Sequence, residues 1–328
     1  MRNLRLALLA LVLAFAGPAL AQTQPDSVNP RALSVQEQQL MQQLRVLDGR
    51  VSIPDQNAAV LIQPAGKEWR DFHQSTMLWV GGISVLGALA ALGLFYMVRG
   101  RIRIDAGASG RTITRFNRLE RFAHWLTAST FIVLGISGLN ITAGKFVLLP
   151  LIGPEAFTAF SQWGKYAHNF LAFPFMLGVV LMLVIWVKDN IPTSADLAWF
   201  KAGGGLIGHG HPPSKRFNGG QKVIFWTVVL GGIALSVSGL LLLFPLQYTD
   251  MAGTQLSNII HGVVGLVMIG VIMAHIYIGS IGMEGAFDAM GSGQVDLNWA
   301  KEHHNLWVEE EMAKGRVAMP PRNAQAAE

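Results

Sequence analysis

Cysteine is absent from this chain of 328 residues. Without it, the chain cannot form disulfide bonds, use a thiol nucleophile, hold an iron–sulfur cluster through thiolates or attach haem covalently through a C-x-x-C-H motif. A metal bound by this chain must therefore be held by histidine or carboxylate groups.

Charged residues are scarce too, at 14% of the sequence against roughly 25% in a soluble domain. Hydrophobic residues make up 51%, and many of them lie in long uncharged runs. Most of the basic residues behind the net charge of +5 lie in a few short loops, so nothing indicates a nucleic-acid partner. The composition predicts a protein of the membrane.

The N-terminus has the pattern of a secretory signal. Arg2 and Arg5 precede the apolar run LALLALVLAFAG, and Ala19-Leu20-Ala21 fits a cleavage site. This apolar run is short for a membrane anchor, which is the alternative interpretation. We therefore predict a cleaved signal peptide over residues 1–21 and an exported segment over residues 22–73.

Five later stretches are long and uncharged enough to cross the hydrocarbon core, which takes about 20 residues of helix. Within lipid such segments must be helical, because their backbone groups have no other hydrogen-bond partners. The expected spans cover residues 74–98, 122–144, 166–187, 223–249 and 251–283. The last stretch exceeds the bilayer, so we expect its helix to begin near Ser257.

Basic residues in the loops set the expected orientation, because lysine and arginine favour the cytoplasmic side. The loops after the first and third spans are basic, whereas the loop after the second offers only Lys145 and Lys165 and the next offers none. This pattern places residues 22–73 in the periplasm and the C-terminal tail in the cytoplasm of a bacterial inner membrane.

Four of the nine histidines fall within the expected spans. Ionisable residues at membrane depth are rare and usually functional, although a single histidine could serve a plain helix–helix hydrogen bond. The orientation puts His124 and His275 towards the cytoplasm, and His168 and His261 towards the exterior. His261 and His275 are separated by about 21 Å of helix and lie on nearly the same face. Each level of the membrane thus receives a pair.

A pair of imidazoles at each level suits haem. Zinc and copper sites usually recruit three or four protein ligands, whereas haem supplies four nitrogens and needs only two axial ones. We predict one haem b between His124 and His275 and another between His168 and His261. Gly135, Ser137, Gly138, Gly262 and Gly265 would leave room for it, or serve helix packing. Arg121 and Lys165, one turn from a ligand, are candidate propionate partners.

The expected fold is therefore an all-α integral membrane protein. It comprises a four-helix transmembrane di-haem bundle over residues 99–283, one extra N-terminal transmembrane helix over residues 74–98 and a tail over residues 284–328. The other histidines are expected at the solvated surface: His73, His209, His211, His303 and His304. The glycine-rich loop around His209 lacks the spacing of a phosphate-binding loop.

Seven pieces between residues 113 and 310 together resemble the cytochrome-b gamma subunit of membrane-bound formate dehydrogenase. They are RFNRLERFAHW, GISG, GKYAHNF, DNIP, RFNGGQKVIFW, IIHGVVGLVMIGVIMAHIYIG and WAKEHHNLW. The resemblance implies two haems b held by the same histidine pairs. It also implies a quinone site beside the cytoplasm-side haem, formed by Asn218, Gly219, Gly220, Gln221 and His275. From the residues alone, Asn218 reads as the start of a helix.

The resemblance further implies a complex. An iron–sulfur beta subunit and a catalytic alpha subunit carrying molybdenum or tungsten would lie on the outer side, and this chain would carry electrons inward to ubiquinone or menaquinone. The formate site would not be on this chain, which resembles an electron conduit. Compared with the shorter members of that family, this chain has three additional parts at its front: the signal peptide, the exported segment and the first span.

Other functions remain open from the sequence. The cytochrome-b subunit of a nickel–iron hydrogenase and related quinone-linked dehydrogenase anchors are built on a similar plan. A transporter with proton-relay histidines would often show repeated helical halves, and no convincing repeat of that kind is present. A structural anchor with histidines used only in packing is the third alternative. A reducible haem band distinguishes a cytochrome from the last two.

Overall fold

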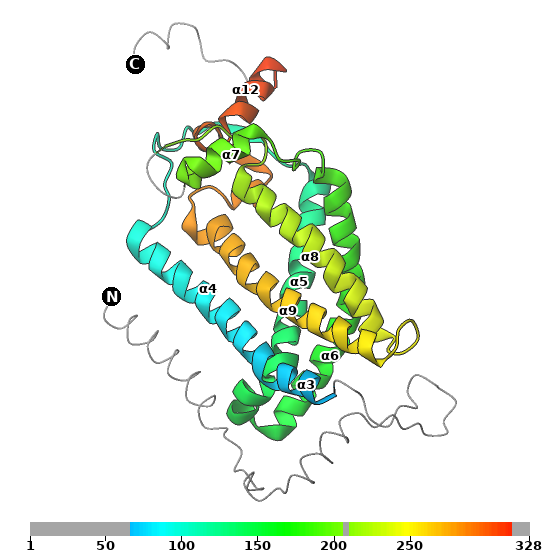
Figure 1. Cartoon of the computed structure of the whole chain (residues 1–328). Coiled ribbons are helices and arrows are strands. Elements are labelled where there is room, and N and C mark those ends of the chain that lie inside the picture. Colours follow the sequence, from blue (N-terminus) through cyan, green and yellow to red (C-terminus); the bar gives the residue numbers. More distant parts are fainter. Residues whose placement is uncertain (1–65, 206–209, 317–328) are drawn as a thin grey trace, which may run out of the picture. The chain divides into compact units, whose positions relative to one another are not determined.

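The computed structural model describes residues 66–205 and 210–316 (Figure 1). The predicted signal peptide, nearly all of the exported segment and His209 lie outside the described residues. The described chain is mainly helical and includes five helices long and apolar enough to cross a membrane. These helices confirm the predicted all-α membrane fold.

The long helices occupy the five predicted stretches. Helix α3 (Gly66–Asp71) and a π-helical turn (Phe72–Thr76) lead into the first. The five long helices are α4 (Met77–Arg99), α5 (Arg118–Val147), α6 (Leu149–Trp186), α8 (Gly219–Leu243) and α9 (Met251–Tyr277). A second π-helical turn (Ile278–Gly282) follows α9.

Two helix starts differ from the prediction for local reasons. Helix α6 begins at Leu149 rather than near residue 166, and Gly153 interrupts it with a φ of 78° before Pro154 opens a regular helix. Helix α9 begins at Met251 rather than near Ser257. There Asp250 Oδ1 accepts a 2.8 Å hydrogen bond from the Gly253 N–H, which caps the helix early.

The chain divides into two compact units, and each long helix contributes to both. Unit 1 comprises the residues up to Leu86 together with Val133–Phe170 and Ala234–Val267. Unit 2 comprises Gly87–Ile132, Leu171–Ile233 and Met268 onwards. His168 and His261 belong to unit 1, whereas His124 and His275 belong to unit 2.

In unit 1, the extra helix α4 packs on α9 through small residues. A Cβ atom at Gly81 would lie 3.3 Å from the Leu266 side chain, and one at Gly262 would overlap the Met77 side chain. Gly262 therefore makes room for Met77 of α4, which is the helix-packing role that the sequence left open beside room for a haem. Close approach at small residues is the usual way in which helices associate in lipid.

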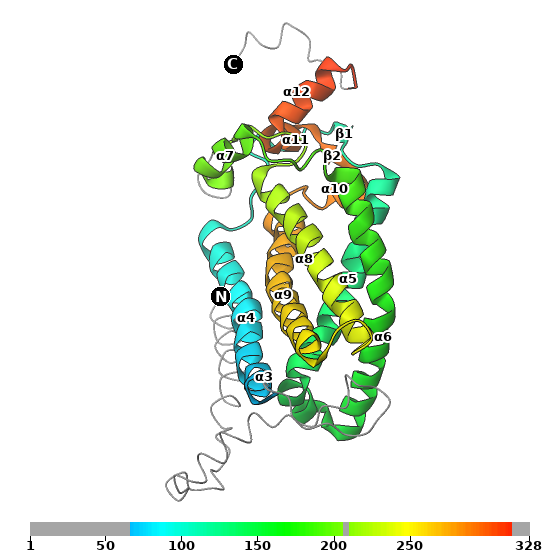
Figure 2. The same ribbon diagram turned by 45° about the vertical axis from the view of Figure 1, so that its right-hand side comes forward.

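Unit 2 carries most of the short elements. They are α7 (Ser194–Lys201), a 3-10 turn (Gly203–Gly205), α10 (Asp288–Gly291), α11 (Leu297–His303) and α12 (Asn305–Ala313). Strands β1 (Thr112–Thr114) and β2 (Gln294–Asp296) pair antiparallel, with Ile113 opposite Val295. Figure 2 shows these elements gathered at one end of the unit. The ribbon is the one small departure from the all-α prediction within the described residues.

The segment after α9 is bound to the loop before α5 within unit 2. The Glu302 carboxylate accepts backbone N–H groups of Asp105 at 3.0 Å and Ala106 at 2.9 Å. The Asp296 carboxylate accepts the Ser109 N–H at 2.8 Å and also caps α11. Residues almost 200 positions apart in the sequence are thus tied together, and α11 is held in place by its own acidic side chains.

Candidate functional site

The structure brings together both histidine pairs that the depth argument predicted. We call His168 and His261 the outer pair and His124 and His275 the inner pair, after their predicted sides of the membrane. The ring centres of the outer pair lie 6.0 Å apart at an interplanar angle of 63°. Those of the inner pair lie 6.1 Å apart at 60°.

This spacing fits one metal ion between two imidazoles. Two metal–nitrogen bonds of about 2 Å, and about 1 Å from each nitrogen to its ring centre, give a separation of about 6 Å. Within the described part of the chain no hydrogen bond joins the two rings of either pair, which disfavours a simple helix–helix contact. The described residues also contain no group of three or more potential metal ligands. The donor set therefore fits a metal that brings its own equatorial nitrogens.

Serine residues orient both rings of the outer pair. Ser137 Oγ on α5 lies 2.8 Å from His168 Nδ1, and Ser238 Oγ on α8 lies 3.1 Å from His261 Nδ1. Each hydroxyl donates its single proton to the carbonyl four residues earlier, of Val133 at 2.7 Å and of Ala234 at 2.6 Å.

Each serine oxygen can then take part in the contact with its histidine only as the acceptor of a hydrogen bond. Nδ1 of each ring therefore carries the proton, and Nε2 is left as a bare donor for a metal. Gly138 and Gly239 lie close to these rings. A Cβ atom at Gly239 would be 3.1 Å from His261 Cε1, so the glycine allows the ring its position.

The inner pair borders a cavity of about 510 Å³ in unit 2. Its apolar wall includes Phe131, Phe175 and Ile272. The Nδ1 atom of His124 is buried and has no hydrogen-bond partner among the described residues. Buried polar atoms in folded proteins are usually hydrogen-bonded, so this nitrogen is an exception. The inner pair thus differs from the outer pair in lacking a serine partner for His124.

The two candidate propionate partners behave differently. Arg121 donates from Nη1 to the Gly291 carbonyl at 2.7 Å, and its Nε atom is buried without a partner in the described structure. Lys165 is exposed on α6.

Three of the residues predicted for quinone, Asn218, Gly220 and Gln221, line this cavity together with His275. Gly219 lies elsewhere, because a Cβ atom there would meet Phe200 of α7 at 2.8 Å. A Cβ atom at Gly220 would lie 2.9 Å from the Trp199 ring. The glycine pair is thus explained in part by the packing of α7 against the start of α8.

Asn218 also caps α8, as the residues alone suggested, and Gln221 returns the contact. Asn218 Oδ1 accepts the Gln221 N–H at 2.9 Å, and Gln221 Oε1 accepts the Asn218 N–H at 3.1 Å. Both carbonyl oxygens are therefore used. Their amide N–H groups remain as donors for a ligand in the cavity.

A buried ion pair holds α7 beside this helix start. Lys222 Nζ lies 2.7 Å from Asp196 Oδ2, and the same oxygen accepts the Thr193 N–H at 2.6 Å. Burial alone would raise the pKa of Asp196, but the Lys222 and Thr193 contacts lower it overall. The carboxylate is therefore charged at neutral pH and fixes α7, with Trp199, against the cavity.

The sequence missed a polar cluster on this cavity. His304, expected at the surface, is only 1% exposed, so the surface prediction was wrong for this residue. His303 is half-buried, and its Nε2 atom is buried. His304 Nδ1 lies 2.8 Å from the Lys215 carbonyl and therefore donates to it, and its buried Nε2 has no hydrogen-bond partner in the part of the chain that the structure describes. Burial and nearby His211 and Arg115 lower the pKa of His303 to about 4. His211 itself is exposed, as expected.

Comparison with known proteins agrees with this geometry. Residues 115–293, more than half of the chain and including all four histidines, match the family described as prokaryotic cytochrome b561. The chain belongs to this family. It is therefore a b-type cytochrome, for which haem b is the expected prosthetic group, and a multi-pass membrane protein.

Three relatives confirm the resemblance found in the motifs. The nitrate-inducible formate dehydrogenase cytochrome b556(Fdn) subunit of Escherichia coli K12 is 28% identical over 208 residues, 62% of this chain and 93% of the relative. The cytochrome b556(fdo) subunit of the same strain is 28% identical over 203 residues, with 61% and 93% covered. The formate dehydrogenase cytochrome b556 subunit of Haemophilus influenzae is 24% identical over 209 residues, with 61% and 84% covered.

Proposed function

We propose that this chain is the cytochrome b subunit of a formate dehydrogenase complex and passes electrons from an iron–sulfur partner subunit across the membrane to quinone. The paired histidines, at ring separations near 6 Å, are the observation that carries the proposal. The three relatives, all subunits of formate dehydrogenases, support the choice of complex. Formate oxidation itself would take place on a molybdenum or tungsten subunit.

Each histidine pair would hold one haem b through its Nε2 atoms. The bound group supplies a site for one-electron transfer. In the outer pair, the serine partners keep both imidazoles in the tautomer that binds iron. Arg121 and Lys165 would neutralise propionates, as long cationic side chains near helix ends commonly do.

Quinone in the cavity beside the inner pair would receive electrons from the haem that this pair would hold. Asn218, Gln221 and His275 supply polar groups there, while the apolar wall accepts the ring. Two protons for the quinol would enter from the cytoplasmic side. Electrons moving inward and protons consumed inside both charge the membrane, at about 2.3 kcal/mol per charge per 100 mV.

The test uses the purified complex and its absorbance spectrum. The wild type should show haem b reducible by dithionite and by formate. His261→Ala should remove the outer haem, halve the haem content and stop formate from reducing the remaining haem. His275→Ala should remove the inner haem and stop quinone reduction, while formate still reduces the outer one.

His73→Ala is the matched control, because His73 precedes the first span and contacts Trp69 rather than another histidine. It should retain both haems. Two intact haems in His261→Ala would contradict the assignment of ligands. Reduction of the wild-type haems by hydrogen and not by formate would assign the chain to a hydrogenase complex instead.

A further inference from the structure

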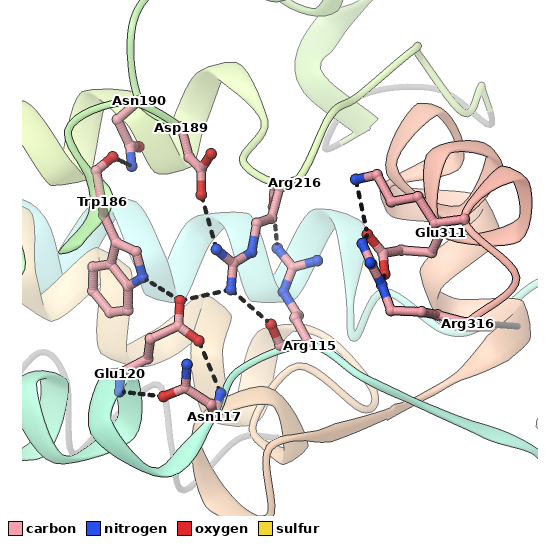
Figure 3. A network of polar contacts seen from close by, with 10 residues as sticks. Arg115, Asn117, Glu120, Trp186, Asp189, Asn190, Arg216, Glu311 and Arg316 are labelled. Atoms are coloured by element: carbon pink, nitrogen blue, oxygen red, sulfur yellow. Dashed lines mark hydrogen bonds and ion pairs between the residues drawn. The ribbon is translucent and has the colours of Figure 1, made fainter.

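A six-residue motif at the start of α5 recurs at the start of α8, and the two copies are hydrogen-bonded to each other. The sequence R-F-N-x-x-E spans 115–120, and R-F-N-x-x-Q spans 216–221. Each arginine reaches the other copy, because Arg115 Nη2 donates to the Arg216 carbonyl at 2.6 Å and Arg216 Nη2 donates to the Arg115 carbonyl at 3.0 Å. Figure 3 shows this exchange.

The remaining positions of the two copies correspond as well. Asn117 Oδ1 accepts the Glu120 N–H at 3.0 Å, as Asn218 does for Gln221 at the start of α8. The rings of Phe116 and Phe217 lie 5.7 Å apart. The two copies thus form a local pair of equivalent helix starts.

The equivalence fails at the sixth position. Arg216 binds the carboxylate of Glu120 at 2.6 Å and that of Asp189 at 2.8 Å (Figure 3). The group in the corresponding position for Arg115 is the neutral amide of Gln221, 3.4 Å away. Among the described residues, Arg115 has no ion pair.

Arg115 is therefore a buried cation without a carboxylate partner. It is only 3% exposed, and its Nη1 atom is buried with no hydrogen-bond partner in the described chain. Burial and Arg216 lower its pKa to about 9, so the guanidinium is charged at neutral pH. The rings of Trp299 and Trp307, at 5.4 and 5.3 Å, compensate part of the desolvation cost.

The same cavity borders Arg115, Gln221 and His275. The carboxylates nearby are engaged elsewhere: Glu302 accepts two backbone N–H groups, and Asp105 lies 3.3 Å from His211. A free N–H of a buried cation at the edge of a cavity is a donor for an anionic oxygen.

We propose that Arg115 binds the oxygen of the quinone that becomes negatively charged during reduction. The inference rests on the proposed function. Quinone takes two electrons, one at a time, from the haem that the inner pair would hold, and two protons from the cytoplasmic side, to form quinol. Arg115 stabilises the charge on its oxygen until the proton arrives. Arg115 donates a hydrogen bond and gives up no proton.

The test compares Arg115→Gln with Gln221→Glu in the complete complex. Gln221→Glu gives Arg115 the carboxylate that Arg216 already has, so this variant should fold even if the first does not. The probes are 2-hydroxy-1,4-naphthoquinone, an anion at neutral pH, and uncharged 1,4-naphthoquinone. Arg111→Gln, which removes an exposed charge from the same segment, is the control.

Both Arg115→Gln and Gln221→Glu should bind the anionic probe roughly ten- to a hundredfold more weakly, since charge-assisted hydrogen bonds are among the strong ones. Binding of the uncharged probe should change much less in Arg115→Gln. In Gln221→Glu it should weaken less than binding of the anionic probe, although this variant also removes the Gln221 amide donor. Formate should still reduce both haems in both variants. The turnover number for quinone should fall, while Arg111→Gln should behave as the wild type.

Equal weakening for the two probes, or wild-type binding in both variants, would overturn the role of Arg115. A shifted potential of the inner haem with unchanged probe binding would also overturn it, since Arg115 would then pair with a propionate. A wild-type complex that neither binds nor reduces a naphthoquinone would instead reject the proposed function.

Discussion

At the scale of single residues, the two histidine pairs differ in what holds their rings. Both outer rings are hydrogen-bonded to serines, whereas His124 Nδ1 has no partner among the described residues. An acceptor on Nδ1–H makes the imidazole a stronger donor to iron and favours the oxidised state. Ser137 and Ser238 are therefore expected to tune the outer haem alone.

Replacing Ser137 or Ser238 by alanine should raise the midpoint potential of the outer haem. Loss of a neutral hydrogen bond, about 0.5–1.5 kcal/mol, corresponds to tens of millivolts for one electron. A potentiometric titration of the complex measures it. Ser129→Ala is the control, because its hydroxyl also bonds back to its own helix, at Trp125, without touching a histidine. A shift confined to the inner haem would contradict this assignment.

The residues that sequence reasoning found and missed differ in kind. The four histidines in the spans were predictable because ionisable residues are rare in membrane-spanning segments and usually have a function. The roles of Arg115 and Arg216 were not predictable. In a sequence, an arginine in a loop indicates only which side of the membrane the loop lies on. The repeated R-F-N-x-x-E/Q motif was the available clue. His303 and His304 were placed at the surface because burial in a polar cluster leaves no hydrophobic pattern.

At the scale of elements, the tail helices α11 and α12 depend on a neutral histidine between them. Burial lowers the pKa of His304 well below its ordinary value, with Arg115 and His303 acting in the same direction and the Lys215 carbonyl opposing them. An undocked tail would take up a proton below about pH 6.5, whereas the docked tail cannot. Docking is therefore strongest above that pH and weakens as the pH falls below it.

Hydrogen exchange of residues 297–313 in the intact complex measures this docking. Protection should fall between pH 6.5 and 5, by up to about 1.4 kcal/mol per pH unit for one proton. His304→Gln keeps a donor for the Lys215 carbonyl but cannot titrate, so its loss of protection should be smaller. His73→Gln, on another element, should behave as the wild type. Equal pH dependence in wild type and His304→Gln would refute the role of this ring.

Helix positions were predicted better than helix ends. Uncharged runs located every span, because hydropathy follows directly from composition. The first part of α6 was not predicted as part of a span. It contains the break at Gly153 and the charged residues Glu155 and Lys165. The short ribbon of β1 and β2 was not foreseeable, because strands of three residues carry too little alternation.

At the scale of the whole molecule, the placement of each loop stays a prediction from its basic residues. Alkaline phosphatase, active only outside the cytoplasm, tests it as a fusion partner. Fusions after Leu148 and Asp250, in loops with few or no basic residues, should be active. Fusions after Lys201 and Gly315 should be inactive. The opposite result would invert the sides assigned to the outer and inner pairs.

The number of spans and the family were both accessible from the sequence, through hydropathy and through motifs spread over residues 113–310. The cavity could not be predicted from the sequence. Its polar edge is formed jointly by the loops before α5 and α8 and by the tail after α9. Such a site depends on contacts between residues more than a hundred positions apart, which one sequence does not reveal.

Helix α9 contributes one histidine to each pair, and it is the last of the five long helices to leave the ribosome. A chain that stops before α9 lacks one member of each pair, so neither pair can form in it. Haem held between such pairs could be incorporated only after α9 has been synthesised. Red colour in the cell membrane would then report chains that extend at least through His275, and shorter chains would stay colourless.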